Sequence, residues 1–154
     1  MSPSCYHAWV MQSAEQHTNE IRVQATVDNT EKVAEFIGTR LQACGCPFDV
    51  QMQIAIAVDE IFGNVVDYAY ETETGFATVR IEVHHDPSEA LITFSDEGIP
   101  YDPLKNDDPD TTLPPDARST GGLGVYFVKN IMDDVSYEYR EGQNILRMRK
   151  SFTH

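Results

Sequence analysis

The sequence predicts an α+β domain in which a mostly antiparallel, mixed sheet of about five strands carries three helices on one face. Five short segments rich in β-branched and aromatic residues indicate the strands, and most of them are joined in pairs by short turns. Three longer segments carry apolar residues at helical spacing. With 154 residues and neither an internal repeat nor a linker, the chain is expected to form one domain at 21–154, behind a weakly structured leader at 1–20.

The first strand and the first helix are expected close to the start of this domain. Residues 21–27, IRVQATV, alternate between apolar and polar side chains, which indicates a strand. A helix from about 30 to 43 follows, with Asp28 as its N-cap and Glu31 three residues later, as in a capping box. Its apolar stripe consists of Val33, Phe36, Ile37 and Leu41.

A second helix is expected from about 50 to 70, capped by Asp49. The apolar residues that recur at helical spacing are Ile54, Val58, Ile61, Val65 and Ala69. Glu60 and Asn64 are four residues apart and therefore lie on one face, one turn from each other, with Asp67 near the same line. This polar stripe is displaced from the centre of the apolar one, so Glu60 and Asn64 could border a pocket beside the core.

The second half of the domain is expected to be two hairpins separated by a loop and a helix. The predicted elements are strands at 77–85 and 90–95, a helix at 123–132, and strands at 135–140 and 144–150. The helix is apolar nearly all round, which predicts that it is well buried.

The long segment between the hairpins carries the strongest functional pattern. A strand ends at Asp96 and Gly98, a polar and proline-rich loop follows, and Gly121, Gly122 and Gly124 open an apolar helix. A loop of this length is usually a lid, a binding loop or disordered. Free N–H groups at the helix start would favour an anion, so the layout suits a nucleotide with its base at Asp96 and its phosphates at the glycines.

Each of these signals also has an ordinary structural interpretation. A solvated helix face accounts for Glu60 and Asn64, an Asp-x-Gly turn accounts for Asp96 and Gly98, and a tight corner accounts for the glycines. The glycines match neither the dinucleotide-binding fingerprint nor the phosphate-binding loop that ends in Gly-Lys-Ser/Thr.

Composition and charge exclude several classes of function. The net charge of −14 argues against nucleic acid as a direct partner, while a basic protein partner and simple solubility remain open. No apolar run approaches membrane-spanning length, and residues 1–20 do not resemble a secretory signal. Cys5, Cys44 and Cys46 form neither a disulfide framework nor a zinc site, which indicates a reducing, cytoplasmic compartment.

Taken together, the three signals resemble the ATP-binding boxes of the GHKL superfamily, which includes gyrase, sensor histidine kinases and MutL. VDEIFGNVVDYAY resembles the N box and FSDEGIPYDP the first glycine box. GGLGVYFVKNIMDDVSYEYREGQNILRMRK resembles the second glycine box and the closing hairpin. The small size and the Asp-Pro after the first box are similar to the RsbW-like anti-sigma factor serine/threonine kinase branch. The resemblance covers about residues 20–150 and implies a Bergerat-type two-layer α/β sandwich.

This resemblance implies a role for each matching residue. Glu60 would be the catalytic base, Asn64 would hold Mg²⁺ and Asp96 would contact the adenine of ATP. Residues 101–120 would form the ATP lid. The residues implied in cofactor binding are Asn64, Asp67, Tyr68, Asp96, Gly98, Ile99, Pro100, Lys105, Arg118, Thr120, Gly121, Gly122, Leu123, Gly124 and Val125. Tyr68 stands where many members of the family carry His, and the lid is unusually acidic.

The resemblance also implies partners. Such kinases phosphorylate a serine of a small anti-anti-sigma protein of the STAS type and sequester a sigma factor, usually as homodimers. The alternative is a regulatory module with the same fold that binds its partners, with or without ATP, and transfers no phosphoryl group. A histidine-kinase fragment is a weaker third interpretation, because no helical segment with a phosphoacceptor His is seen ahead of the domain.

Overall fold

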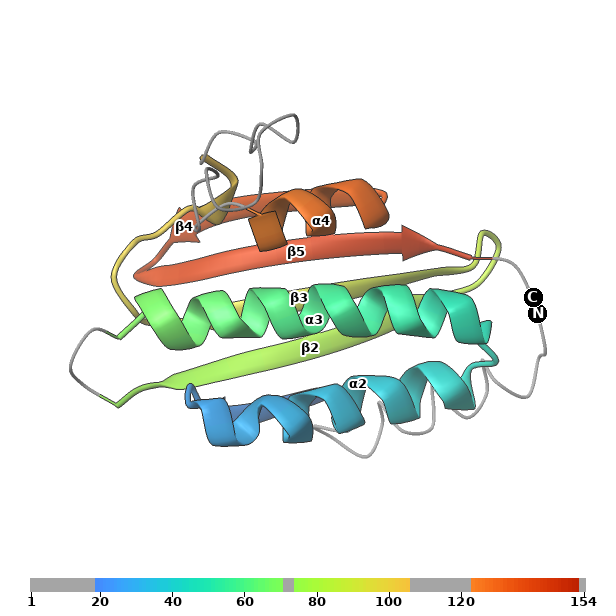
Figure 1. Cartoon of the computed structure of the whole chain (residues 1–154), viewed down its shortest axis with the longest axis horizontal. Helices are drawn as coiled ribbons and strands as arrows, with labels where there is room; N and C mark the ends of the chain where they lie inside the picture. Colours follow the sequence, from blue (N-terminus) through green and yellow to red (C-terminus); the bar gives the residue numbers. More distant parts are fainter. Residues whose placement is uncertain (1–18, 71–73, 106–122, 153–154) are drawn as a thin grey trace.

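The computed structural model describes residues 19–70, 74–105 and 123–152. Within these ranges, five strands form one sheet in the order β1-β2-β3-β5-β4, and every neighbouring pair is antiparallel. Helices α2, α3 and α4 lie on one face of the sheet (Figure 1). The elements are β1 Glu20–Gln24, α2 Thr30–Ala43, α3 Phe48–Tyr68, β2 Phe76–His84, β3 Glu89–Asp96, α4 Leu123–Ile131, β4 Asp134–Arg140 and β5 Gln143–Ser151. The predicted α+β fold with helices on one face is confirmed.

Alternation along the central strands builds the core. In β2, every second residue from Ala77 to Val83 is buried, and β3 and β5 repeat the pattern. Side chains with this period of two point to one face of a sheet, here the face under the helices. The largest fully buried side chains include Phe62, Phe94, Ile37, Leu41, Ile54 and Ile61.

The predicted apolar stripes of α2 and α3 pack against this face. Val33, Ile37 and Leu41 of α2 are buried, and so are Ile54, Val58 and Ile61 of α3. Phe36 is only partly buried, because it lies at the border of the stripe, where the guanidinium of Arg40 stacks over its ring at 3.9 Å.

Two predictions at the start of the domain were wrong: the end of the first strand and the N-cap of the first helix. Strand β1 ends at Gln24, because Gln24 pairs with Phe76, the first residue of β2, and the ladder between the two strands ends with this pair. Asp28 lies in a short 3-10 helix, Val27–Asn29, so Asn29 is the N-cap of α2, and it makes no side-chain cap bond.

Helix α3 begins two residues earlier than predicted. Pro47 takes the N-cap position, and its carbonyl accepts the first helical bond from Gln51 N at 2.9 Å. Asp49 therefore lies inside the first turn, where its carboxylate interacts with the helix dipole instead of capping the end.

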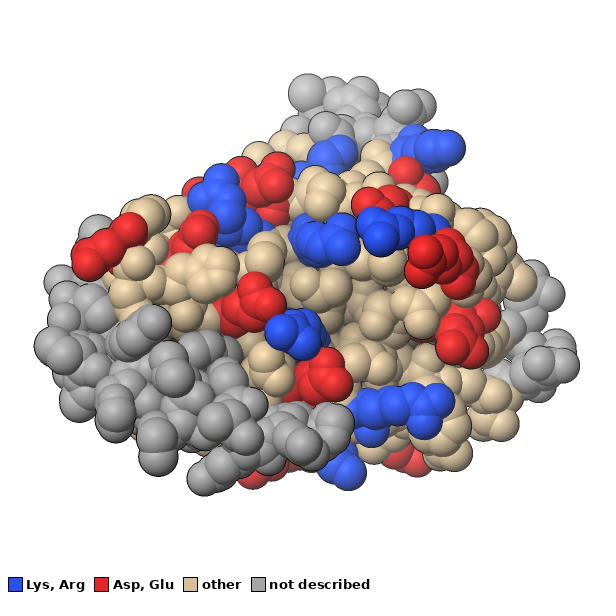
Figure 2. Space-filling view, turned by 180° about the vertical axis from the view of Figure 1, so that it is seen from behind, with Lys and Arg blue, Asp and Glu red and all other residues tan. Residues whose placement is uncertain are grey.

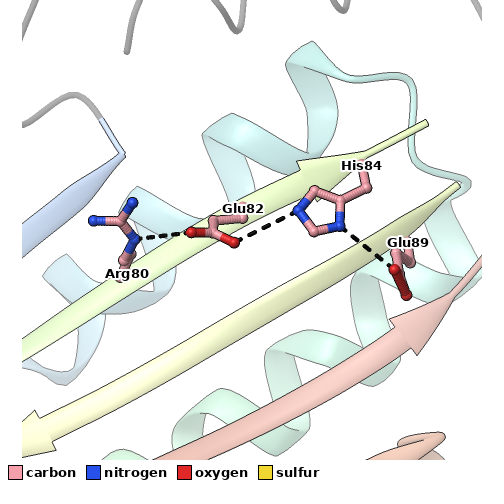
Figure 3. Close-up of polar contacts among 4 residues, drawn as sticks. All are labelled: Arg80, Glu82, His84 and Glu89. Carbon is pink, nitrogen blue, oxygen red and sulfur yellow. Dashed lines mark hydrogen bonds and ion pairs between the residues drawn. The ribbon is translucent and has the colours of Figure 1, made fainter.

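The other face of the sheet carries half-exposed charged side chains (Figure 2). Arginines and glutamates alternate over its strands in ion pairs. The residues involved are Glu20, Arg80, Glu82, His84, Glu89, Glu138, Arg140, Arg147 and Arg149. Figure 3 shows one row, in which Glu82 contacts Arg80 at 3.1 Å and His84 at 3.5 Å, and His84 contacts Glu89 at 3.4 Å. Pairs this exposed contribute little to folding.

In the described part of the chain, no helix has the length and apolar character needed to cross a membrane.

Candidate functional site

A narrow pocket opens between the second half of α3, the end of β3 and the hairpin of β4 and β5. Its floor is apolar and consists of Ile61, Val65, Phe94 and Leu146. Its polar residues are Asn64, Tyr68, Asp96, Tyr101, Tyr137 and Asn144. The fold thus brings Asn64, Tyr68 and Asp96, three residues expected from the sequence to act together, to a single pocket.

Asp96 is the buried carboxylate of this pocket, with 7% of its surface exposed. Its Oδ1 atom accepts hydrogen bonds from Gly98 N and from Asn144 Nδ2, both at 2.9 Å. Burial raises the pKa of Asp96 above its ordinary value, and the two hydrogen bonds offset part of that rise. Among the described residues, no hydrogen bond reaches Oδ2, so this oxygen remains as an acceptor for a ligand.

Asn144 is a site residue that the sequence reasoning missed. It lies opposite Asp96 in the pairing of β3 with β5 and is 7% exposed. Its position carried a signal, because Asn144 shares the alternating face of β5 with the buried residues Leu146 and Met148. A polar side chain on an apolar face needs hydrogen-bond partners, and here Asp96 is one of them.

The segment after β3 is tied to the end of α3. Ile99 N donates to the Ala69 carbonyl at 2.9 Å. A Cβ atom on Gly98 would overlap the same carbonyl, so only glycine permits this close approach. Tyr70 adds a second link, because its hydroxyl accepts from Glu97 N at 2.9 Å and donates to the Phe76 carbonyl at 2.7 Å.

Tyr101 lies on Tyr68 at the mouth of the pocket. The two rings are stacked, with centroids 4.5 Å apart and an interplanar angle of 22°. The remaining cavity has a volume of about 30 Å³. That is room for a water molecule or two, whereas sites for drug-sized ligands are about ten times larger or more. The cavity between these rings and the floor of the pocket is therefore too small, as it stands, for a nucleobase.

Glu60 lies on the side of α3 that faces α4, and Asn64, one turn later in the same helix, lines the pocket. The side-chain nitrogen of Asn64 donates to the main-chain carbonyl of Glu60 at 2.9 Å, so the side-chain oxygen of Asn64 is directed away from this hydrogen bond. The Glu60 carboxylate lies directly against Gly124, where any Cβ atom would overlap it. The Glu60 carboxylate thus lies beside the first turn of α4, where the helix dipole favours an anion, and the Asn64 amide lies one turn further along α3.

The other expected site residues fall into three groups. Asp67, Ile99, Pro100 and Lys105 are exposed and do not line the pocket, whereas Val125 is buried and Leu123 is the first residue of α4. Arg118, Thr120, Gly121 and Gly122 lie outside the described residues, as does most of the expected lid at 101–120.

Residues 23–150 match the histidine kinase-like ATPase domain. The chain belongs to this family. Among curated proteins, it is similar to the serine-protein kinase RsbW of Bacillus velezensis, with 30% identity over 106 residues, and to that of Bacillus mycoides, with 26% over 104 residues. Each alignment covers 66% of this chain and 65% of the relative, so the chain matches just under two thirds of the length of these relatives.

Two solved structures share the fold of this ATPase-domain protein. The RsbU and RsbW domains of a Mycobacterium tuberculosis protein align with a TM-score of 0.60 and 12% identity, over 88% of this chain and 33% of that one. A histidine kinase domain of a blue-light activated kinase from Erythrobacter litoralis aligns with a TM-score of 0.52 and 15% identity, over 78% and 61%. At these identities the likeness concerns the fold alone.

Proposed function

We propose that this protein is a Mg²⁺- and ATP-dependent serine/threonine kinase of the anti-sigma type. The observation that carries the proposal is the pocket at Asp96, in which one oxygen of a buried aspartate is left without a partner among the described residues. Membership of the ATPase-domain family and similarity to relatives named serine-protein kinase support the same activity.

The chemistry of the residues in the pocket fits ATP. Asp96 Oδ2 would accept a hydrogen bond from the exocyclic amine of adenine, and Tyr68 would stack on the base once Tyr101 has moved. Asn64 would supply a neutral oxygen to Mg²⁺, an ion that prefers few protein ligands together with substrate phosphates. Bound ATP supplies the phosphoryl group to be transferred.

Glu60 is the residue that would activate the acceptor. It is exposed, so a serine hydroxyl of a partner protein can reach it, and it lies at the turn of α4 expected under the phosphates. A carboxylate in that place would accept the hydroxyl proton as the serine attacks. The rest of phosphoryl transfer is positioning and charge neutralisation, for which few side chains suffice.

The proposed partners are supported by the similarity to relatives named serine-protein kinase RsbW. The serine would belong to an anti-anti-sigma protein of the STAS type, and the kinase would also sequester a sigma factor, as a homodimer in the cytoplasm. Neither nucleic acid nor a membrane is expected to bind directly, given the net charge of −14.

The narrowness of the pocket favours a second candidate function. Tyr101 stacked on Tyr68 leaves no room for a base, as would be expected of a module that binds partners without nucleotide or without phosphoryl transfer. The alternative shares the fold and the partners but lacks the reaction.

Two experiments separate these functions. Titration calorimetry with Mg-ATP would compare the unchanged protein with Asp96→Asn and Asn64→Ala. Saturable binding that weakens in both variants supports the ATP site, whereas no binding to the folded protein at millimolar ATP would contradict it.

Glu60→Gln then tests the reaction. If ATP still binds but phosphorylation of an anti-anti-sigma protein is lost, the kinase is supported. If Glu60→Gln regulates its partners as well as the unchanged protein does, the non-catalytic module is supported.

A further inference from the structure

We propose that Asn144 is a positioning residue that makes the pocket select adenine over guanine, by holding one oxygen of Asp96 and leaving only the other to the base. This inference rests on the proposed function, because it concerns which nucleotide the same pocket accepts. It goes further by assigning the preference to a residue of β5 that acts through Asp96.

The orientation of the Asn144 amide follows from its neighbours. Tyr101 N, a main-chain donor, lies 3.1 Å from the amide oxygen, and the Tyr137 hydroxyl donates to the same oxygen. A main-chain N–H cannot accept, so the oxygen and not the nitrogen of the amide must face Tyr101. The amide nitrogen consequently faces Asp96.

Every hydrogen-bonding position of this amide is in use. Its two N–H groups donate to Asp96 Oδ1 at 2.9 Å and to the Ile99 carbonyl at 2.8 Å. Its oxygen carries two lone pairs, and two donors reach it. Since the side chain is buried on the sheet beside Leu146, it cannot turn toward a ligand without leaving several buried groups unpaired.

This arrangement determines what the pocket offers to a base. Asp96 Oδ1 is occupied by Asn144 and Gly98, so the carboxylate presents a single acceptor, Oδ2. One acceptor fits the one exocyclic amine on the edge of adenine. Guanine presents two adjacent donors, which suit a carboxylate with both oxygens free, and a carbonyl that needs a donor. The Asn144 amide has no donor left for that carbonyl.

The test measures nucleotide preference rather than affinity alone. Dissociation constants for Mg-ATP and Mg-GTP would be measured by calorimetry on the unchanged protein, Asn144→Ala and Asn144→Thr. Loss of the amide removes one of the two donors to Asp96 Oδ1 and leaves only Gly98 N there, so this oxygen regains a lone pair that a second donor of guanine can use. The preference for ATP over GTP should therefore fall by about tenfold in Asn144→Ala, the effect of one hydrogen bond to a charged group. Asn144→Thr restores a donor to Oδ1 and should recover part of the preference.

A matched control is Asn130→Ala on the outer face of α4. Among the described residues, the one hydrogen bond that the Asn130 amide donates goes to the Tyr126 carbonyl of its own helix, at 2.7 Å. Its removal should leave the preference unchanged. Thermal unfolding identifies any variant that is not folded, and Asn144→Thr tests the inference if Asn144→Ala does not fold.

The possible results are distinct. A folded Asn144 variant that keeps the full preference for ATP overturns the role of Asn144 and leaves the kinase proposal intact. An unchanged protein that binds neither nucleotide overturns both. A preference that falls in Asn144→Ala and in Asn130→Ala alike also overturns the inference, because the effect would then not pass through Asp96.

Discussion

Asp96 combines a cost to folding with a proposed use in nucleotide binding. Its burial raises its pKa, which means that the ionised carboxylate is less stable in the folded protein than in the unfolded chain. Replacing a buried charge by a neutral group of the same shape removes that cost. The structure therefore predicts that stability and nucleotide binding respond to Asp96 in opposite directions.

The variant Asp96→Asn should make this opposition measurable. Its amide oxygen can still accept from Gly98 N and Asn144, but its amide nitrogen replaces the acceptor that is free for a base. We expect unchanged or higher thermal stability and ATP binding weakened about tenfold or more. Calorimetry and thermal unfolding on the same sample check both. A variant that loses stability while it keeps its affinity for ATP would contradict this account of Asp96.

The raised pKa also predicts how ATP binding depends on pH. An amine that donates to Asp96 favours the carboxylate, so ATP affinity should fall as the pH is lowered through the raised pKa of Asp96. The pH dependence of stability has the opposite sign. Asp96 contributes most favourably to the free energy of unfolding at pH values below its pKa in the unfolded chain, near 4. This contribution is lost as the pH rises through the higher pKa of Asp96 in the folded protein. The phosphates of ATP titrate as well, so the pH profile of ATP affinity for Asp96→Asn, which lacks the carboxylate, serves as the reference. Parallel pH profiles for the two proteins would refute the assignment.

Tyr101 should respond differently from the other pocket residues, because its ring covers the face of Tyr68 on which the proposed function places the base. We expect Tyr101→Ala to bind ATP about three- to tenfold more tightly, since an aromatic pair is worth about 0.5–1.5 kcal/mol. Tyr101→Phe keeps the stacked ring and serves as the control, with affinity close to that of the unchanged protein. Weaker binding in Tyr101→Ala would mean that the ring contacts the base instead of competing with it.

The elements are joined near the pocket by main-chain contacts rather than by side chains. The end of α3 and the segment that follows β3 are held together by the bond from Ile99 N to the Ala69 carbonyl. Gly98 lies at the point of closest approach, and α2 contains a glycine, Gly38, with open space around it. These two glycines allow the contact to be tested.

Gly98→Ala should destabilise the fold, because its new Cβ atom meets main-chain atoms that cannot turn aside. We expect a loss of about 1–3 kcal/mol in the free energy of unfolding, as for other overpacked positions. Gly38→Ala should instead stabilise by about 0.5–1 kcal/mol, since alanine restricts the unfolded chain in an open helical position. Denaturant unfolding of both variants provides the comparison. Equal effects would show that the approach to Ala69 is not tight.

Across the whole molecule, charge is distributed unevenly. The net charge is −14, yet the open face of the sheet gathers arginines that pair with glutamates (Figure 2). Salt weakens both the repulsion among the acidic groups and the attraction within these pairs. Because the pairs are half-exposed, the repulsion should be the larger of the two effects.

Raising NaCl from low concentration to about 0.5 M should therefore raise the unfolding temperature at neutral pH. A change of about 2–4 °C corresponds to about 1 kcal/mol in a chain of this size. Scanning calorimetry in NaCl, rather than in sulfate, avoids the general stabilisation produced by strongly excluded salts. A lower unfolding temperature in salt would mean that the ion pairs of the open face outweigh the repulsion.

The order and type of the elements could be predicted from the chain alone. Helix α2 spans the predicted residues, and the strands of the two hairpins lie within one or two residues of their expected ends. These features depend on side-chain periodicity and turn residues within about a dozen positions, which a sequence shows directly. The errors at Asp28 and Asp49 arose where two residues competed for one helix cap, and Asn29 and Pro47 took those positions.

The contacts inside the pocket could not be predicted in the same way. Asp96 and Asn144 are 48 residues apart and meet only because β3 and β5 pair in one particular register. A shift of one residue would turn Asn144 to the charged face. Tyr101 reaches Tyr68 because the segment after β3 is bonded to the end of α3. Local sequence patterns are enough to predict the elements and the family. Long-range packing determines the rest: which oxygen of Asp96 is left without a partner among the described residues, how Asn144 contacts Asp96, and how narrow the pocket is.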